Sequence, residues 1–338
     1  MAATIKEVAQ RAGVSVGTVS NVLTGLTPVS EELRARVHAA VAELDYHPNY
    51  VARSLKTRQT HMLGLVISDI TNPFFPQLMR GAEDAAWKHN YVLTTFNTGE
   101  QLEREKQILD VLRRRSVDGI LMVLASDGGE LSHIRQAMQS SPVVFVDRVP
   151  HTGDWDTICA DNAGGARDCV AHLLAQGHRR IGILAGAQAL HTGRERLRGY
   201  LEALEAARIT PCPELIHDCG FRSQLACAAT ERLLSLDSPP TAIFSCNIMM
   251  TLGMLEAVAR RGLRCPEDIA LATFDDLPLL RAVHPHLTAV AQPAYDLGYR
   301  GAEMLIHRIQ GKLPEQRVQL TLPATVVVRE STMLPLLS

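Results

Sequence analysis

Small and polar residues gather in one stretch near the start of the chain: Ser15, Val16, Gly17, Thr18, Ser20 and Asn21. Such residues can contact the edges and the backbone of double-stranded DNA. Asn21 could form a bidentate hydrogen bond with adenine, Val16 could contact a thymine methyl group, and Gly17 would let the backbone approach closely. The three hydroxyl residues suit phosphate oxygens better. The alternative is a solvated helix face that happens to be small and polar.

A second set of chemically capable residues follows short apolar segments further along the chain: Asp69, Asn72, Phe74, Phe75, Asp147, Arg148, Thr192, Arg194, Arg196, Asn247, Asp275 and Asp276. If those segments are neighbouring parallel strands, the residues converge in the crevice at the carboxyl ends of the strands. Carboxylates, amides and guanidiniums can hold the hydroxyls of a small polyol while an aromatic ring covers its apolar face. The alternatives are structural: Asp69 and Asp275 as caps, Phe74 and Phe221 in the core, and Asp147 with Arg148 as an ion pair.

The first set requires short helices, and the local sequence carries their start and stop signals. Thr4 followed by Glu7 forms a capping-box pattern, and Gly13 can end the helix in the left-handed conformation. Ser15 can cap a second helix, and Ser30 can start a third. Apolar residues recur at helical spacing in all three: Ile5, Val8, Ala9, Ala12, Val19, Val22, Leu23, Leu33, Val37, Val41 and Leu44. Three short helices with one shared core predict a helix-turn-helix domain, whose second helix enters the major groove.

The second set requires a sheet. From His61 onward, short apolar runs alternate with helical stretches, a pattern typical of parallel strands with crossover helices. The predicted strands are residues 63–67, 92–96, 119–124, 143–146, 158–160, 181–184, 242–245, 269–274 and 287–291. Because so many strands are too many for one comfortable sheet, we expect two lobes that divide near residues 159–161.

Two segments in order, TIKEVAQRAGVSVGTVSNVL at residues 4–23 and DYHPNYVARSLKTR at residues 45–58, closely resemble the lactose-repressor (LacI/GalR) family. The resemblance continues through SDITNPFF at residues 68–75. It implies an N-terminal all-α helix-turn-helix domain, a hinge helix with its linker, and a two-lobed α/β effector-binding and dimerisation domain with parallel doubly wound sheets, like that of periplasmic binding proteins. The expected boundaries are 1–47, 48–60 and 61–338, with a first lobe at 61–160 and 291–322 and a second at 161–290 and 323–332. The resemblance also implies that strand 287–291 returns the chain to the first lobe and that residues 324–328 pair in the second.

The resemblance makes residues 49–55 a hinge helix that inserts Leu55 between base pairs from the minor groove. A helix of about seven residues is too short to be stable alone in water, so it should fold only against a partner. An apolar wedge kinks DNA, while Arg53 would meet phosphate. Thr4, Asn49 and Ala52 complete the expected DNA-contacting residues. The alternative is an ordinary linker.

The resemblance also selects among the polar residues that follow the strands. It implies effector contacts for Phe75 in the NPxF motif, for Asp147, Arg196 and Asp275, and for Phe221 as an aromatic platform. Arg148, Thr192 and Asn247 complete the expected effector site. One departure from the family is visible, because Asn247 is followed by Ile248 where the family usually has Asp. A polar contact or a helix cap is therefore expected to be missing there.

Composition agrees with a soluble regulator. The formal charge is minus 2, and residues 1–60 hold seven basic and five acidic side chains, so the remainder carries minus 4. The charge is segregated in the direction that DNA binding favours, without a basic coat. Seven cysteines without CxxC pairs predict neither a disulfide framework nor a zinc module. No stretch approaches the roughly 20 apolar residues of a membrane span, so we expect a cytoplasmic protein.

Other functions are disfavoured. The sequence has no nucleophile elbow, Walker loop or glycine fingerprint, so we expect no catalysis and no cofactor. His284 and His286 lack a third nearby ligand, so we expect no metal. A free-standing sugar-binding protein stays an alternative, but it would not need residues 1–58. We therefore expect a repressor that binds a pseudo-palindromic operator as a homodimer, under the control of a sugar or sugar derivative, with a purine-like effector left open.

Overall fold

The computed structural model describes residues 3–24, 28–46, 59–126, 131–139, 141–151, 153–282 and 284–333. Two units are distinguished, one up to Thr60 and one from His61 onward. The predicted hinge segment, with Asn49, Ala52, Arg53 and Leu55, lies outside the described residues.

The first unit contains α1 (Ile5–Ala12), α2 (Val16–Thr24) and α3 (Glu31–Glu43). The capping box of Thr4 and Glu7 is present, and Gly13 ends α1 with a φ of 63°. Ser30 caps α3 by accepting a hydrogen bond from the amide of Leu33. The core of this unit contains Val8, Ala9, Ala12, Val19, Val37, Ala40 and Tyr46. The predicted helix-turn-helix arrangement is therefore confirmed.

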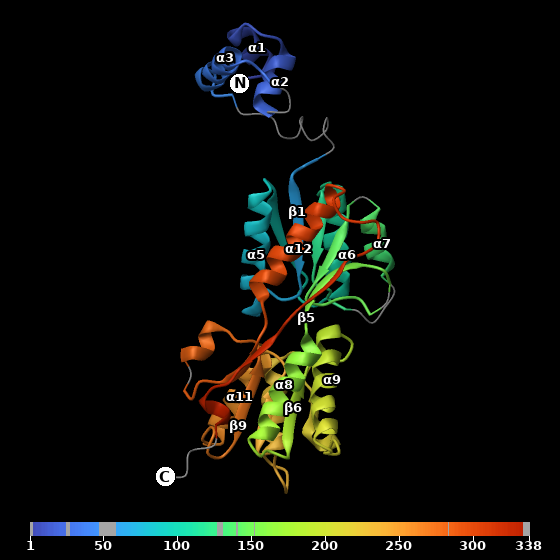
Figure 1. Cartoon of the computed structure of the whole chain (residues 1–338), viewed down its shortest axis with the longest axis vertical. Helices are drawn as coiled ribbons and strands as arrows, with labels where there is room; N and C mark the ends of the chain where they lie inside the picture. The colour runs from blue at the N-terminus through green and yellow to red at the C-terminus, as the bar shows by residue number, and fades with distance from the viewer. Residues whose placement is uncertain are drawn as a thin grey trace. The chain divides into compact units, whose positions relative to one another are not determined.

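The first lobe of the second unit is a sheet of β1 (Met62–Ile67), β2 (Val92–Asn97), β3 (Gly119–Met122), β4 (Val143–Val146), β5 (Asp156–Ala160) and β11 (Gln319–Leu322). The strand order is β11-β5-β4-β3-β1-β2, and all neighbours are parallel. Its helices are α5 (Phe74–Lys88), α6 (Leu102–Arg114), α7 (Ser132–Met138) and α12 (Ala294–Ile309). Helices α5 and α12 pack side by side (Figure 1) and share one apolar cluster with the sheet, whereas α6 and α7 share another. Burial on both faces explains why the strands read as continuous apolar runs.

The second lobe is a sheet of β6 (Ile181–Ala185), β7 (Ile216–Asp218), β8 (Ala242–Ser245), β9 (Ala270–Phe274), β10 (Thr288–Ala291) and β12 (Thr325–Val327). The order is β12-β10-β9-β8-β6-β7, and only the pairing of β12 with β10 is antiparallel. Its helices are α8 (Asn162–Ala175), α9 (His191–Ala206), α10 (Ser223–Leu233) and α11 (Ile248–Arg260), with short 3-10 turns η1 (Pro213–Leu215), η2 (Pro278–Ala282) and η3 (Glu330–Thr332).

The chain passes between the lobes at three short connections: residue 161, residues 292–293 and residues 323–324. The amide of Asp161 donates a hydrogen bond of 2.8 Å to the carbonyl of Leu322, which ties two of these connections together. The side chain of Asp161 caps α8 by accepting from the amide of Gly164 at 2.8 Å. The two lobes are therefore joined by three short connections that leave the ends of strands.

The observed strands differ from the sequence predictions at two sheet edges. Strand β10 pairs in register with β9 in the second sheet, and the chain crosses to the first lobe directly after it, at residues 292–293. Strands β7 and β11 were not predicted, because both are short, exposed in part and lie at sheet edges. The tail does pair in the second lobe, through β12.

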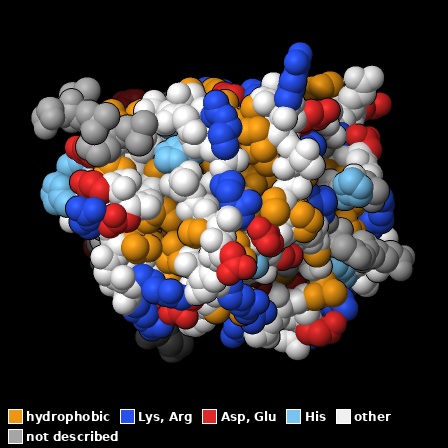
Figure 2. Space-filling model, turned by 90° about the horizontal axis from the view of Figure 1, so that it is seen from below, with side chains coloured by type: hydrophobic (Ala, Val, Ile, Leu, Met, Phe, Trp, Pro, Cys, Tyr) orange, Lys and Arg blue, Asp and Glu red, His pale blue; other side chains and the backbone are white. Residues whose placement is uncertain are grey.

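The surface carries no single dominant charge on the face shown in Figure 2, where basic, acidic and apolar side chains are interspersed. This mixture matches the formal charge of minus 2. Among the helices that the structure describes, none combines the length and apolar character needed to cross a bilayer.

Candidate functional sites

The outward face of α2 presents the predicted DNA-reading residues. Val16 is 41% exposed despite its apolar side chain, and Gly17 beside it is also exposed. Thr18, Ser20 and Asn21 are half-buried, whereas Val19 between them is completely buried. The helix therefore separates a core-facing side from an accessible side in the way the sequence predicts.

Two predicted DNA contacts also serve as helix caps. The hydroxyl of Ser15 accepts from the amide of Thr18 at 3.1 Å and bonds to its hydroxyl at 2.9 Å. Thr4 accepts from the amide of Glu7 at 3.4 Å, while its own amide donates to the Glu7 carboxylate at 2.7 Å. Both residues thus have a structural role that does not require DNA.

Two basic residues of the first unit are committed to its fold. Arg11 on α1 pairs with Glu43 on α3 at 2.6 Å. The Arg36 guanidinium donates to the carbonyl of Ala12 at 2.6 Å and to that of Gly13 at 3.2 Å, which satisfies the end of α1. Sequence reasoning counted both toward the DNA-binding charge and missed these roles. Their long separation along the chain gave no local signal of the pairing.

The second set of predicted residues surrounds one cavity between the lobes. All eight expected effector contacts line it: Phe75, Asp147, Arg148, Thr192, Arg196, Phe221, Asn247 and Asp275. Asn72, Phe74 and Gln292 line it as well. Gln292 was missed, because nothing in its sequence context marks the connection between β10 and α12 as part of a site.

The parallel topology explains this convergence. In the first lobe, Phe75 starts α5 after β1, and Asp147 follows β4. In the second lobe, Phe221 follows β7 and Asp275 follows β9, while Arg196 lies on α9 after β6. All these connections leave the carboxyl ends of parallel strands, where open α/β sheets place their binding crevice.

Arg196 is a buried charge in the cavity and is held by several contacts. Its Nε donates to Asn162 Oδ1 at 2.8 Å, and its Nη1 donates to the carbonyl of Cys246 at 2.6 Å. The guanidinium lies 3.7 Å from the ring centroid of Phe274. Burial lowers the pKa of Arg196, and the carboxylates of Asp275 and Asp147 oppose that shift. A guanidinium held on three sides is a rigid, preorganised donor.

Two carboxylates flank this arginine in different ways. Burial raises the pKa of Asp147 to about 6, although Arg196 and Arg148 counteract the shift. Asp275 accepts from the amide of Ile248 at 3.0 Å and from the side-chain amide of Gln292. The Asp275 side chain therefore has the predicted structural role and also faces the cavity.

The helix cap that was expected to be missing near Asn247 is present. The Asn247 side chain accepts from the amide of Met250 at 2.8 Å and caps α11. Ile248 is fully buried in the apolar cluster of the second lobe rather than in the cavity lining. The helix cap is thus present, and the departure from the family pattern replaces a polar side chain with a core residue.

Three cavity residues hold the left-handed backbone conformation, with φ values of 65° at Asp147, 62° at Phe221 and 84° at Asp275. Such conformations cost free energy for residues other than glycine, most of all for a bulky ring, and they concentrate at functional sites. Gly186 makes the Phe221 position possible, because a Cβ there would lie 2.1 Å from the ring.

Several other candidates lie outside this cavity. Asp69 accepts from the amide of Thr71 at 2.9 Å, as in the predicted turn. Asp276 pairs with Arg329 at 2.8 Å and borders an adjoining hollow of about 320 Å³. Arg194 is not among the residues that line the cavity.

The cavity itself is narrow. Its free volume is about 20 Å³, close to the room needed for one water molecule. The Arg148 guanidinium lies 5.4 Å from the ring centroid of Phe221 and so bridges the two lobes. A larger ligand would have to separate side chains of opposite lobes. Binding and lobe position are therefore physically linked.

Among the described residues, no group of three or more His, Cys, Asp or Glu side chains is placed to hold a metal ion. His286 contacts Glu330 at 3.1 Å, and its ring centroid is 4.5 Å from that of His284. All seven cysteines are free thiols.

Comparison with known proteins supports the two parts of the chain described above. The family model for bacterial regulatory proteins of the lacI family matches residues 4–49, and the model for a periplasmic binding protein-like domain matches residues 170–332. The ribose operon repressor of Haemophilus influenzae is 36% identical over 97% of this chain and 98% of its own. The transcriptional repressor PurR of Aliivibrio salmonicida is 34% identical over the same shares.

A solved structure extends the likeness to the whole fold. The lac repressor dimer bound to operator and the anti-inducer ONPF superimposes with a TM-score of 0.88 at 28% identity, covering 99% of this chain and 100% of that one. The family consists of transcriptional repressors rather than enzymes. The chain therefore belongs to the lacI family of transcriptional regulators, with a periplasmic-binding-protein-like effector domain.

Proposed function

We propose that this regulator binds a pseudo-palindromic operator as a homodimer and that a neutral monosaccharide of pentose size, with ribose as the first candidate, controls its operator affinity. The observation that carries the proposal is the cavity, where aromatic rings, guanidiniums, carboxylates and amides from both lobes converge. A sugar ring presents hydroxyls at its edge and an apolar face, which such a lining can bind at once.

Relatives support the choice of ribose. Two ribose operon repressors, from Haemophilus influenzae and Escherichia coli, are 36% and 37% identical to this chain over nearly its whole length. A purine is the second candidate, because a PurR is 34% identical and because Phe75 and Phe221 could enclose a flat ring.

On the DNA side, we propose that Val16, Gly17 and Asn21 choose the sequence. Residues 49–55 would act as a hinge helix that forms only against DNA and inserts Leu55 into the minor groove. One short helix reads too few base pairs for genomic specificity, so two-fold symmetry would double the site. Ligand in the cavity would change lobe closure and thereby the pairing of the two hinge helices. Ligand and DNA affinities are then reciprocally coupled.

A thermal-shift screen tests the effector. Purified protein is melted with D-ribose, other pentoses, hexoses and purine bases, and a ligand at 100 times its Kd should stabilise the fold by about 2.7 kcal/mol. Stabilisation by ribose alone supports the first candidate, and stabilisation by hypoxanthine alone supports the second. If neither the sugars nor the purine bases raise the melting temperature, the effector proposal is contradicted.

The DNA role is tested by binding to palindromic and random duplexes at several salt concentrations. We expect a salt-sensitive preference for a palindrome that Leu55→Ala weakens while ligand affinity is kept. A protein that shows no preference for any palindromic duplex would contradict the operator proposal.

A further inference from the structure

Glu100 holds the one arginine that bridges the two lobes at the cavity. The Arg148 side chain is only 6% exposed, and its Nη2 donates to Glu100 Oε1 at 2.7 Å. Its Nη1 donates to the carbonyl of Leu124 at 3.3 Å. Glu100 itself is not among the residues that line the cavity. The contact that links this carboxylate to the cavity lining is therefore its ion pair with Arg148.

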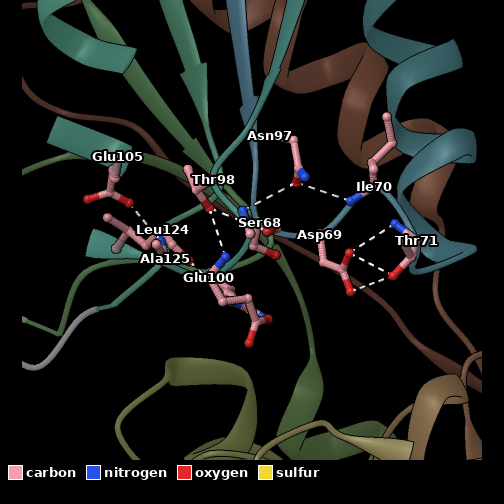
Figure 3. A network of polar contacts seen from close by, with 12 residues as sticks. Ser68, Asp69, Ile70, Thr71, Asn97, Thr98, Glu100, Glu105, Leu124 and Ala125 are labelled. Atoms are coloured by element: carbon pink, nitrogen blue, oxygen red, sulfur yellow. Dashed lines mark hydrogen bonds and ion pairs between the residues drawn. The ribbon is translucent and has the colours of Figure 1, made fainter. Parts of the chain in front are cut away.

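The backbone around Glu100 is held in a defined conformation that orients its side chain. Gly99 and Glu100 both have left-handed backbone conformations, with φ values of 59° and 60°. The amide of Glu100 donates to the carbonyl of Ser68 at 2.9 Å and to the hydroxyl of Thr98 at 3.3 Å. Figure 3 shows Thr98 hydrogen-bonded to both Ser68 and Glu100 where strands of the first lobe end. A glutamate in this conformation is strained, and strain of this kind points to a role for the side chain.

The same turn is tied to the loop that leads into the cavity. The Asn97 side chain accepts from the amide of Ile70 at 3.1 Å, and the Thr98 hydroxyl donates to the carbonyl of Ser68 at 3.3 Å (Figure 3). That loop continues through Asn72 to Phe75, both of which line the cavity. Glu100 is thus held in place relative to Arg148, with which it pairs, and relative to the loop that carries Asn72 and Phe75.

The charges around the cavity show what this pairing does. The lining has two acids, Asp147 and Asp275, and two guanidiniums, Arg148 and Arg196. Glu100 adds a third carboxylate that occupies one edge of Arg148. An arginine without such a partner is a strong site for phosphate or carboxylate groups, because its planar donors match their geometry.

We propose that Glu100 is a positioning and specificity residue: it holds Arg148 against the cavity and neutralises it, so that the cavity accepts neutral sugars and rejects phosphorylated ones. This inference rests on the proposed sugar-binding function. It assigns the choice between a free sugar and its phosphate to a residue outside the lining.

The test compares the full chain with Glu100→Gln, using Glu103→Gln as the matched control. Glu103 lies nearby on α6, is 78% exposed and pairs with Lys106 at 2.6 Å, so its loss removes the same charge without touching Arg148. Titration calorimetry with D-ribose and with D-ribose 5-phosphate gives the affinity ratio. Glu100→Gln should lower ribose affinity about tenfold and shift the ratio toward the phosphate by more than that, because a charged hydrogen bond to Arg148 is lost. Glu103→Gln should change neither.

Two further variants separate positioning from general damage. Glu100→Asn suits the left-handed backbone better than glutamate does and should show the same change in selectivity. In an Arg148→Ala background, adding Glu100→Gln should leave the affinity ratio unchanged, because the residue through which Glu100 acts is absent. Additive effects in that double variant, or equal losses for both ligands in Glu100→Gln, would overturn the proposal.

A failure of the sugar proposal is distinguishable. If the unmodified protein binds neither compound, the proposed effector class is wrong, and inorganic phosphate becomes the probe. Phosphate should then raise the melting temperature of Glu100→Gln but not that of the unmodified protein. The absence of that difference would contradict the role of Glu100 as well.

Discussion

Helix α2 and the cavity between the lobes differ in how their residues are brought together. Residues 16–21 lie together on α2 and follow its cap Ser15, and they are exposed or half-buried apart from Val19. The eight expected effector contacts come from both lobes, are buried, and in three cases hold strained backbone. Local physics therefore suffices to form the exposed face that we propose reads DNA, whereas the cavity that we propose binds the ligand needs the whole domain. The two regions should be separable by mutation.

The largest expected effect comes from Arg196→Ala. This change removes donors to Asn162 and Cys246 and leaves Asp147 and Asp275 without their shared cation. Ligand affinity should fall about 100-fold or more, because several charged hydrogen bonds are lost at once. DNA binding without ligand should survive. Arg198→Ala is the control on the same helix, since Arg198 is exposed and bonds only to Glu195 and Glu202 in the contacts described. Equal loss of operator binding would break the separation.

Asn21→Ala tests the other region. Operator affinity should fall by roughly 1 to 3 kcal/mol and base preference should relax at one position per half-site. Binding to a set of single-base operator variants at fixed salt measures this, with ligand affinity as the internal control. A uniform loss on all duplexes would mean that Asn21 contacts phosphate instead.

Gly186→Ala tests how the cavity is assembled. A Cβ at this position would meet the Phe221 ring, so the ring must move and ligand affinity should fall about tenfold. Gly182→Ala, whose Cβ would only press on the flexible end of Leu233, serves as the control. Calorimetry compares the two. If Gly186→Ala binds ligand normally, Phe221 is not a platform.

The smallest effect is a pH dependence. Because burial raises the pKa of Asp147 to about 6, its carboxylate begins to protonate below neutral pH and can no longer accept charge-assisted hydrogen bonds from sugar hydroxyls. Ligand affinity should fall about fourfold between pH 7.5 and 5.5. The folded state binds this proton more readily than the unfolded chain does, so protonation of Asp147 stabilises the fold. The expected loss of ligand affinity at low pH is therefore not caused by unfolding that Asp147 triggers. The control is Asp147→Asn, which should bind weakly at both pH values. A flat profile in the unmodified protein would exclude Asp147 as the ionised acceptor.

Much of the molecule was predictable from local signals. Thr4, Gly13 and Ser30 marked helix ends because capping acts over three or four residues, and the buried strands stood out as apolar runs. The edge strands β7 and β11 were not predictable, because they are short and only partly buried.

The sequence by itself determined the order of domains, the exposed face of α2 and the residue types that line the cavity, because these follow from neighbouring residues or from a family motif. Only the tertiary structure decided how Arg148 is held. Its partners Glu100 and Leu124 and its ring contact Phe221 are distant in sequence, and no local pattern links them. Ion pairs and cavities depend on distances across the fold, and those distances exist only once both sheets have formed.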